Sequence, residues 1–319
     1  MNPLVKDTDN IRLGIIGLTE GNYHPYSWSA IINGYNREKM SSECPVKVIP
    51  EYLNREPESS FNIKNAKVTH IFCDNIKDAE HTAECSLIPN VVKNPEDMAG
   101  AVDAVIIATD IGSEHVRRAR PFIEAGIPLF IDKPLCDNLD DLRIFKRWVV
   151  DEGKKIISSS GLRYSKEFIP YQLSTNSLGR LRLVMTAMCK YWETYGIHAV
   201  EPIFTITGPG YLSVQNTGTA ERNIVHLIHE KEIDVVISCS KKHKAGPVIL
   251  IGDQDDVSIS TKDTFFAFRK QMQSFIDYLV TGQEPHPFAH TIELMKIIAA
   301  GIMSREAGGK KIYLKEIEL

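Results

Sequence analysis

Two side chains in this sequence have the chemistry and setting needed to move a proton. Lys133 follows the apolar run IPLFI, and His198 lies in the helical segment YWETYGIHAVEPIF. An ammonium can donate to a hydroxyl or carbonyl oxygen, and an imidazole can accept a hydroxyl proton near neutral pH. Glu201 would share a helix face with His198. Glu193 lies earlier in the same segment. A solvated Lys-Pro turn and a structural helix histidine are the alternatives.

A glycine-containing turn follows the first apolar run, IRLGIIG. Backbone N–H groups at such a turn can bind a pyrophosphate, and an acid after the second strand can bond ribose hydroxyls. Asp74, after VTHIFC, would be that acid. The pattern is imperfect, because Thr19 and Asn22 stand at the second and third glycine positions counted from Gly17, and Gly21 comes one residue early. An ordinary strand-to-helix turn fits equally well.

The elements that must position these groups change in type halfway along the chain. Before about residue 160, apolar runs alternate with helical patterns, which predicts a doubly wound parallel sheet. Strands are expected at 11–17, 68–73, 101–109, 127–131 and in KKIISSSG, and helices at 26–35, 114–126 and 138–152. Lys133 would then emerge at the carboxyl edge of the sheet, where α/β proteins bind ligands. Residues 23–65 are expected to hold one helix and an inserted loop.

The second half predicts an α+β domain with an open, mostly antiparallel sheet. Strands are expected at 180–189, 222–229, 233–239 and 247–251, and helices at 265–281 and 289–307. We therefore expect two domains, 1–160 and 161–319, with the C-terminal helices able to pack back on the first.

The segment AVDAVIIATDIGSEHVRRARPFIEAGIPLFIDKPL resembles the Gfo/Idh/MocA family of nicotinamide-dependent oxidoreductases. Further matches occur in SSSGLRYSKEF, in YGIHAVE and in two C-terminal segments, so the resemblance covers most of the chain except about 23–65. Its most specific motif is Asp132-Lys133-Pro134, which stands where the family has Glu-Lys-Pro. The resemblance implies a Rossmann domain followed by an open-faced sheet domain, with the active site between them.

The resemblance also implies roles for individual residues. The implied cofactor contacts are Thr109, Asp110, His115, Asp132, Lys133 and Pro134, and the implied substrate contacts are Arg163 and Tyr164. For Arg163 and Tyr164, a structural ion pair between domains is an equal alternative. The family has an acid four residues before the histidine and an Asp three after it, where this chain has Thr194 and Glu201. The Lys133-Pro134 bond is a candidate cis peptide.

Composition and spacing exclude several partners. Lys and Arg total 37 against 41 Asp and Glu, so there is no basic excess for nucleic acid. No apolar stretch approaches the roughly 20 residues that span a bilayer. The six cysteines are scattered without a CxxC pair, which favours reduced thiols in a cytoplasm. His226 and His229 lie three apart in a predicted strand and would face opposite ways, so no metal site is expected.

We therefore expect an NAD(P)-dependent oxidoreductase acting on a secondary alcohol of a sugar, cyclitol or polyol derivative. NAD is expected over NADP, because the Asp74 carboxylate would repel a 2′-phosphate. By resemblance, a homodimer or homotetramer would form through the second sheet. A glycosidase that oxidises, eliminates and reduces again remains open, as does an inactive dinucleotide-binding sensor or scaffold. His24, Tyr26 and Trp28 could line the cofactor site or form an exposed aromatic loop.

Overall fold

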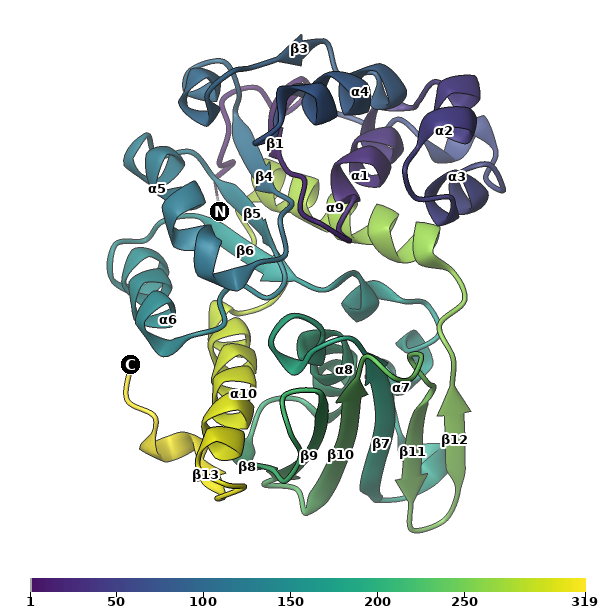
Figure 1. Ribbon diagram of the computed structural model, residues 1–319, viewed down its shortest axis with the longest axis vertical. Coiled ribbons are helices and arrows are strands. Elements are labelled where there is room, and N and C mark those ends of the chain that lie inside the picture. The colour runs from purple at the N-terminus through teal and green to yellow at the C-terminus, as the bar shows by residue number, and fades with distance from the viewer. Residues whose placement is uncertain (1) are drawn as a thin grey trace. The chain divides into compact units, whose positions relative to one another are not determined.

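The apolar runs of the first half form a six-stranded parallel sheet in the order β3-β2-β1-β4-β5-β6 (Figure 1). Its strands are β1 (Ile11–Ile16), β2 (Ala66–Phe72), β3 (Asn90–Val91), β4 (Ala104–Ile107), β5 (Leu129–Asp132) and β6 (Ile156–Ser159). Every residue of β4 and β5 is buried, as expected for parallel strands covered on both faces. The strand order reverses direction between β1 and β4, and such a switch point is where open α/β sheets bind ligands.

This computed structural model describes residues 2–319, and contacts divide them into two units. Unit 1 comprises residues up to 132, 147–158 and 264–287, and unit 2 comprises 133–146, 159–263 and 288–319. The helices of unit 1 include α1 (His24–Asn33), α4 (Ile76–Ser86), α5 (His115–Glu124) and α9 (Thr264–Thr281). The division therefore differs from a single boundary at residue 160, because α9 groups with the first sheet.

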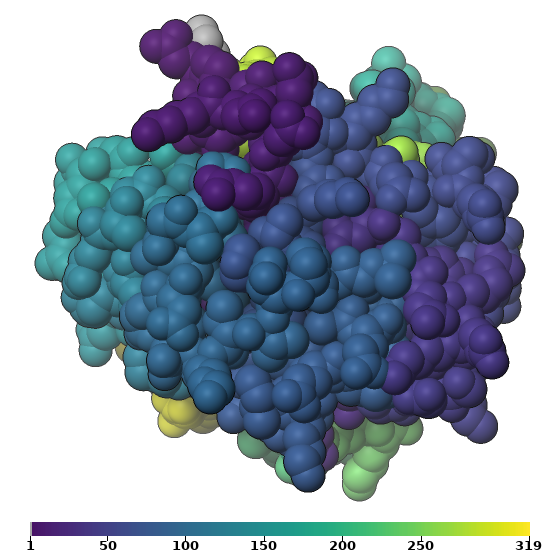
Figure 2. Space-filling view, turned by 90° about the horizontal axis from the view of Figure 1, so that it is seen from above, coloured from purple at the N-terminus to yellow at the C-terminus, as the bar shows by residue number. Residues whose placement is uncertain are grey.

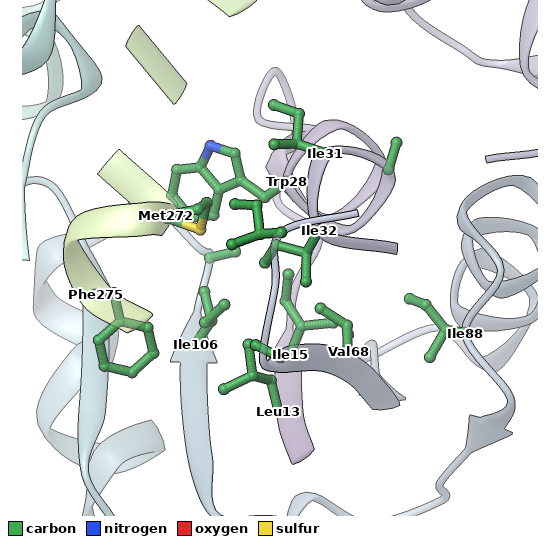
Figure 3. Close-up of a cluster of buried hydrophobic side chains, with 14 of the residues drawn as sticks. Leu13, Ile15, Trp28, Ile31, Ile32, Val68, Ile88, Ile106, Met272 and Phe275 are labelled. Carbon is green, nitrogen blue, oxygen red and sulfur yellow. The ribbon is translucent and has the colours of Figure 1, made fainter. Parts of the chain in front are cut away.

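The core of unit 1 joins segments that are far apart in the sequence (Figure 3). Leu13 and Ile15 from β1 and Trp28 from α1 are fully buried. Met272 and Phe275 of α9 enter the same cluster and are also fully buried. Helix α9 is thus a structural part of the parallel-sheet unit.

The N-terminal residues lie on the surface of unit 1 beside the end of α9 (Figure 2). The backbone N–H of Leu4 donates to the carbonyl of Leu279 over 2.8 Å. This contact connects the first residues of the chain to a helix near its other end.

The expected loop within residues 23–65 is wrong, because two short helices follow α1. They are α2 (Arg37–Glu43) and α3 (Val48–Leu53). The side chain of Asn36 caps α2 by accepting from the Lys39 N–H over 3.0 Å. Met40 and Leu53 are fully buried, so each helix attaches to the core through apolar residues.

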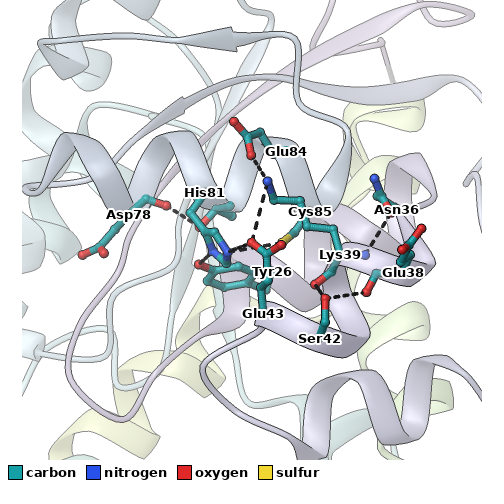
Figure 4. A network of polar contacts seen from close by, with 11 residues as sticks. Tyr26, Asn36, Glu38, Lys39, Ser42, Glu43, Asp78, His81, Glu84 and Cys85 are labelled. Atoms are coloured by element: carbon teal, nitrogen blue, oxygen red, sulfur yellow. Dashed lines mark hydrogen bonds and ion pairs between the residues drawn. The ribbon is translucent and has the colours of Figure 1, made fainter.

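A polar network connects α2 to α1 and α4 (Figure 4). The hydroxyl of Tyr26 and Nδ1 of His81 are 2.7 Å apart, and Nε2 of His81 lies 3.2 Å from Glu43. Lys39 forms an ion pair with Glu84. Burial raises the pKa of Tyr26 well above its usual value, so the phenol stays protonated. Tyr26 therefore has a structural partner in this network.

Unit 2 contains a seven-stranded sheet in the order β12-β11-β7-β10-β9-β8-β13. Its strands are β7 (Leu181–Cys189), β8 (Tyr211–Asn216), β9 (Arg222–His229), β10 (Ile233–Ser240), β11 (Val248–Gly252), β12 (Asp256–Ile259) and β13 (Ile312–Tyr313). The sheet is antiparallel except for the parallel pair β7 and β10. This confirms the expected mostly antiparallel sheet and adds β8, β12 and β13, which the sequence did not indicate.

The helices of unit 2 are α6 (Leu139–Lys146), α7 (Ile169–Leu173), α8 (Trp192–Thr207) and α10 (Phe288–Glu306). Helices α8 and α10 contact each other and the sheet. The indole of Trp192 links them, since its Nε1 donates to the Ile298 carbonyl over 2.9 Å. No helix within residues 2–319 has the length and apolar character of a bilayer span.

Candidate functional site

The turn after β1 passes closely against the start of α1. A Cβ atom at Gly17 would lie 2.4 Å from Cγ of Pro25, so only glycine allows this approach. Within the turn, the Thr19 hydroxyl donates to the Asp110 carboxylate over 2.6 Å, which links it to the residues that follow β4. Gly21 adopts a positive φ of 80°. The start of α1 is bonded within the chain, because the His24 N–H donates to the Asn22 side-chain oxygen over 3.0 Å and the Tyr26 N–H donates to the Tyr23 carbonyl over 3.1 Å. Pro25, which lies between them, has no N–H.

Asp132 is connected to the glycine turn. Its carboxylate is almost completely buried, accepts from Asn22 Nδ2 over 3.0 Å and lies 3.0 Å from Nδ1 of His24. The His24 ring stacks on Trp28 with 4.3 Å between ring centres. Trp28 is fully buried, so it supports the turn from the core and does not form an exposed aromatic loop.

The residues after β4 combine a structural histidine with an unpartnered hydroxyl. His115 is fully buried, and its Nε2 lies 3.0 Å from the Thr109 carbonyl oxygen, which stabilises the turn into α5. The buried Thr109 hydroxyl has no hydrogen-bond partner within the described chain. A buried polar group at the switch point of the sheet suits a polar ligand.

Asp74 forms a two-point ion pair that sequence reasoning missed. Two nitrogens of Arg118 in α5 donate to its carboxylate over 3.1 and 2.6 Å, and Arg118 also contacts Glu114. The hydrogen bonds from Arg118 lower the pKa of Asp74. The Asp74 side chain is 61% exposed while that of Arg118 is 7% exposed, so the carboxylate is held at the surface by a buried guanidinium. The run HVRRARPF was the only sequence signal for this partner.

Lys133 and His198 meet at one aromatic ring in unit 2. Lys133 is 2% exposed, and its Nζ lies 5.1 Å from the centre of the Tyr195 ring. The His198 ring packs edge-on against Tyr195, with 4.9 Å between ring centres. The bond between Lys133 and Pro134 is cis, as expected.

His198 is oriented by the segment that follows β6. Its Nδ1 lies 2.7 Å from the Ser160 hydroxyl. Glu201 is buried and accepts from the Ser160 backbone N–H over 2.6 Å and from Arg163 over 3.0 Å. Glu201 therefore holds in place the segment around Ser160, which contacts His198.

The other predicted residues of unit 2 lie near this group with different partners. Glu193 accepts from Arg305 of α10 over 2.6 Å. Arg163 and Tyr164 line a surface pocket of about 310 Å³ together with His290. Burial, and then the charge of Arg163, lower the pKa of His290. The two histidines of β9 do not share a face, because His226 pairs with Asp234 at the surface and His229 is buried.

The six-stranded parallel sheet, with its order β3-β2-β1-β4-β5-β6, is of the Rossmann class. Residues 11–159 match the model of the "Oxidoreductase family, NAD-binding Rossmann fold". These residues, a little under half of the chain, are therefore similar to the Gfo/Idh/MocA family.

Several proteins of similar sequence or structure are inositol dehydrogenases. A stretch of 130 residues is 31% identical to inositol 2-dehydrogenase of Rhodococcus erythropolis, covering 39% of this chain and 37% of that protein. Myo-inositol 2-dehydrogenase of Lactobacillus plantarum superposes with a TM-score of 0.74 at 14% identity over 95% of this chain and 99% of that one. Scyllo-inositol dehydrogenase of Lactobacillus casei, bound to NAD(H) and scyllo-inositol, gives 0.73 at 13% identity over 96% and 100%. At these identities the two structures establish the fold.

Proposed function

We propose that the protein is an NAD-dependent dehydrogenase that oxidises a secondary alcohol of a cyclitol, sugar or related polyol. The observation that carries the proposal is the grouping of Lys133 and His198 around the Tyr195 ring. Removal of a hydroxyl proton needs a base and a cationic donor that converge on one oxygen. The inositol dehydrogenases among the similar proteins support a cyclitol as the first substrate to test.

Unit 1 fits the dinucleotide that this reaction needs. The unpartnered Thr109 hydroxyl suits a polar ligand, and the exposed Asp74 carboxylate suits ribose hydroxyls. When bound, NAD⁺ supplies the hydride acceptor for the oxidation of a carbinol carbon.

Lys133 and His198 act on the substrate oxygen in different ways. The ammonium of Lys133 donates to the hydroxyl oxygen and stabilises the negative charge that develops there. His198 accepts the hydroxyl proton at Nε2, because Nδ1 is bonded to Ser160. The Arg163–Glu201 pair keeps Ser160 in place, so these two residues act on the histidine through the backbone.

The test is a turnover assay on the purified full-length chain. NAD⁺ is mixed with myo-inositol, scyllo-inositol and a panel of sugars, and NADH formation is followed by absorbance. Sustained NADH formation with one of these substrates supports a dehydrogenase. Cleavage of an aryl glycoside without net NADH indicates the glycosidase alternative. Tight NADH binding without turnover of either kind indicates a sensor or scaffold.

A further inference from the structure

Three charged or titratable groups of unit 2 surround the phenol of Tyr195. Nζ of Lys190 donates to the Tyr195 hydroxyl over 2.6 Å and lies 4.1 Å from the ring centre. Nζ of Lys133 lies 5.1 Å from the same ring centre, and the His198 ring packs at 4.9 Å. A tyrosine in contact with both candidate catalytic residues and with a second ammonium is more than a packing residue.

The backbone at Lys190 has an unusual conformation. Lys190 lies between the end of β7 and the start of α8 and has a φ of 62°, which residues other than glycine rarely adopt. Residues in such conformations concentrate at functional sites. Here the backbone conformation accompanies a side chain that reaches the Tyr195 hydroxyl.

The predicted acids near His198 are engaged with other groups. Glu193 pairs with Arg305, and Glu201 accepts from Ser160 and Arg163. Tyr195 precedes His198 by three residues and therefore shares its face of α8. The side chain that contacts the imidazole ring from the preceding turn is thus a phenol whose oxygen is bonded to an ammonium.

We propose that Tyr195 is a further catalytic residue, whose hydroxyl donates a hydrogen bond to the substrate oxygen that gives its proton to His198. This inference rests on the proposed function. Lys190 is the positioning residue, because it acts on the substrate only through the phenol. A phenol has one O–H donor besides its acceptor lone pairs, and the donation from Lys190 uses an acceptor position.

The arrangement suits the transition state of the oxidation. Hydrogen bonds in a chain polarise one another, so the ammonium strengthens the donation from Tyr195. As the carbinol C–H bond breaks, negative charge grows on the substrate oxygen, and a fixed donor stabilises that charge more than it stabilises the alcohol. Tyr195 keeps its own proton throughout.

The first test compares kcat among variants of the full chain. Tyr195→Phe keeps the ring that Lys133 and His198 contact and removes the hydroxyl, so we expect kcat to fall by about 10²–10³-fold with NADH affinity unchanged. Lys190→Met is also expected to lower kcat. In the double variant, Lys190→Met is expected to add nothing, since its effect passes through the phenol.

The matched control is Tyr191→Phe. Tyr191 is the N-cap residue of α8, and Nζ of Lys241 lies 4.2 Å from the centre of its ring. The same loss of one phenolic oxygen at this position is expected to leave kcat at the wild-type value.

A second measurement does not depend on turnover. The ultraviolet titration of the wild type minus that of Tyr195→Phe isolates tyrosinate formation at Tyr195. The titration of Lys190→Met minus that of the double variant isolates the same phenol without the Lys190 ammonium. A nearby cation favours the phenolate, so tyrosinate is expected to form at lower pH when Lys190 is present than when it is replaced by methionine. Lys133 and His198 face the ring in both comparisons.

Wild-type kcat in Tyr195→Phe would overturn the catalytic role of Tyr195 while the dehydrogenase assignment stands. Additive losses in the double variant would overturn the role of Lys190 as a residue that acts through the phenol. Identical difference titrations would overturn the role of Lys190. A wild-type protein that turns over no alcohol overturns the proposed function itself, and the assigned role of Tyr195 with it.

Discussion

At the scale of residues, the neighbours Asp132 and Lys133 serve different clusters. Asp132 accepts from Asn22 and lies beside His24 in unit 1, while Lys133 contacts the Tyr195 ring in unit 2. Consecutive side chains of an extended backbone point to opposite sides, so one dipeptide can contribute to both groups. The Asp-Lys-Pro motif therefore combines support of the glycine turn with a candidate catalytic ammonium.

Replacement of this ammonium tests the residue most directly tied to the proposed chemistry. Lys133→Met keeps an apolar stem and removes the charge, so we expect kcat to fall by at least about 10²-fold, as is typical when a positioned donor or base is lost. NADH affinity, measured by fluorescence titration, is expected to stay unchanged. The exposed Lys244→Met serves as the control. A Lys133→Met enzyme with wild-type kcat would contradict the role.

Asp74 is expected to set the preference for NAD. In the wild type, NADH is expected to bind more tightly than NADPH, because the carboxylate repels a 2′-phosphate. Asp74→Asn removes that charge and leaves the Arg118 guanidinium without one of its two carboxylates. We expect the ratio of the Kd for NADPH to the Kd for NADH to fall by about tenfold in this variant. Equal wild-type affinities for NADH and NADPH would contradict the assignment.

The same ion pair predicts a pH dependence of stability. The hydrogen bonds from Arg118 lower the pKa of folded Asp74 from its ordinary 3.8, so the charged carboxylate stabilises the fold above that pH. This contribution is lost as the pH falls through the lowered pKa. Asp74→Asn is expected to lower Tm slightly at neutral pH, since the carboxylate is exposed, and the difference should vanish in acid. A Tm difference that grows on acidification would be the opposite result.

At the scale of elements, Trp192 determines how closely α8 and α10 can pack. Its indole is fully buried and lies between two glycines, one on each helix. A Cβ at Gly196 would meet the ring at 2.6 Å, and a Cβ at Gly301 would meet it at 2.4 Å. Both positions exclude a side chain, because the indole is fully buried and its Nε1 is bonded to the Ile298 carbonyl of α10.

Gly301→Ala is therefore expected to destabilise the protein despite the higher helix propensity of alanine. Overpacking of a well-filled core typically costs about 1–3 kcal/mol, while alanine gains about 1 kcal/mol over glycine in a helix. We expect a Tm lowered by a few degrees, measured by circular dichroism. Met303→Ala on the partly exposed side of the same helix is the control, expected to change stability by about 0.5 kcal/mol or less. A higher Tm in Gly301→Ala would show that the ring moves aside.

At the scale of the whole molecule, the two units are built from interleaved segments of chain. Helix α9 follows strands β7 to β12 of unit 2 in the sequence, yet its residues Met272, Phe275 and Leu279 are buried in the core of unit 1. A cut after residue 160 would remove these side chains from the first core. The chain therefore cannot be divided into halves that each keep their own core.

A fragment of residues 1–160 is expected to lack a cooperative thermal transition. Loss of three buried large apolar side chains removes about 2–5 kcal/mol each, which approaches or exceeds the whole stability of a domain. The same fragment joined to residues 264–287 by a glycine-serine linker is expected to regain the transition, measured by circular dichroism. Cooperative melting of the shorter fragment alone would contradict the structural role of α9.

The sequence by itself determined the fold class and the positions of the main candidate residues. The runs that form β1, β4 and β5 can be recognised in the sequence because parallel strands buried on both faces are mostly apolar, and Lys133 follows one of them. The prediction that His198 lies on a helix is confirmed. Helices α2 and α3 were missed because seven and six residues are too few to display a helical period.

Only the tertiary structure decided which side chains meet. Asp74 and Arg118 form an ion pair although they are 44 residues apart in the sequence. Helix α9 packs in the core of unit 1 although strands β7 to β12 of unit 2 precede it in the sequence. Lys190 bonds to the Tyr195 hydroxyl, and its backbone has a positive φ that the residue type alone does not predict. Periodicity shows which face of an element is buried, but the partner of a polar side chain depends on crossovers and loop geometry, which a local pattern does not contain.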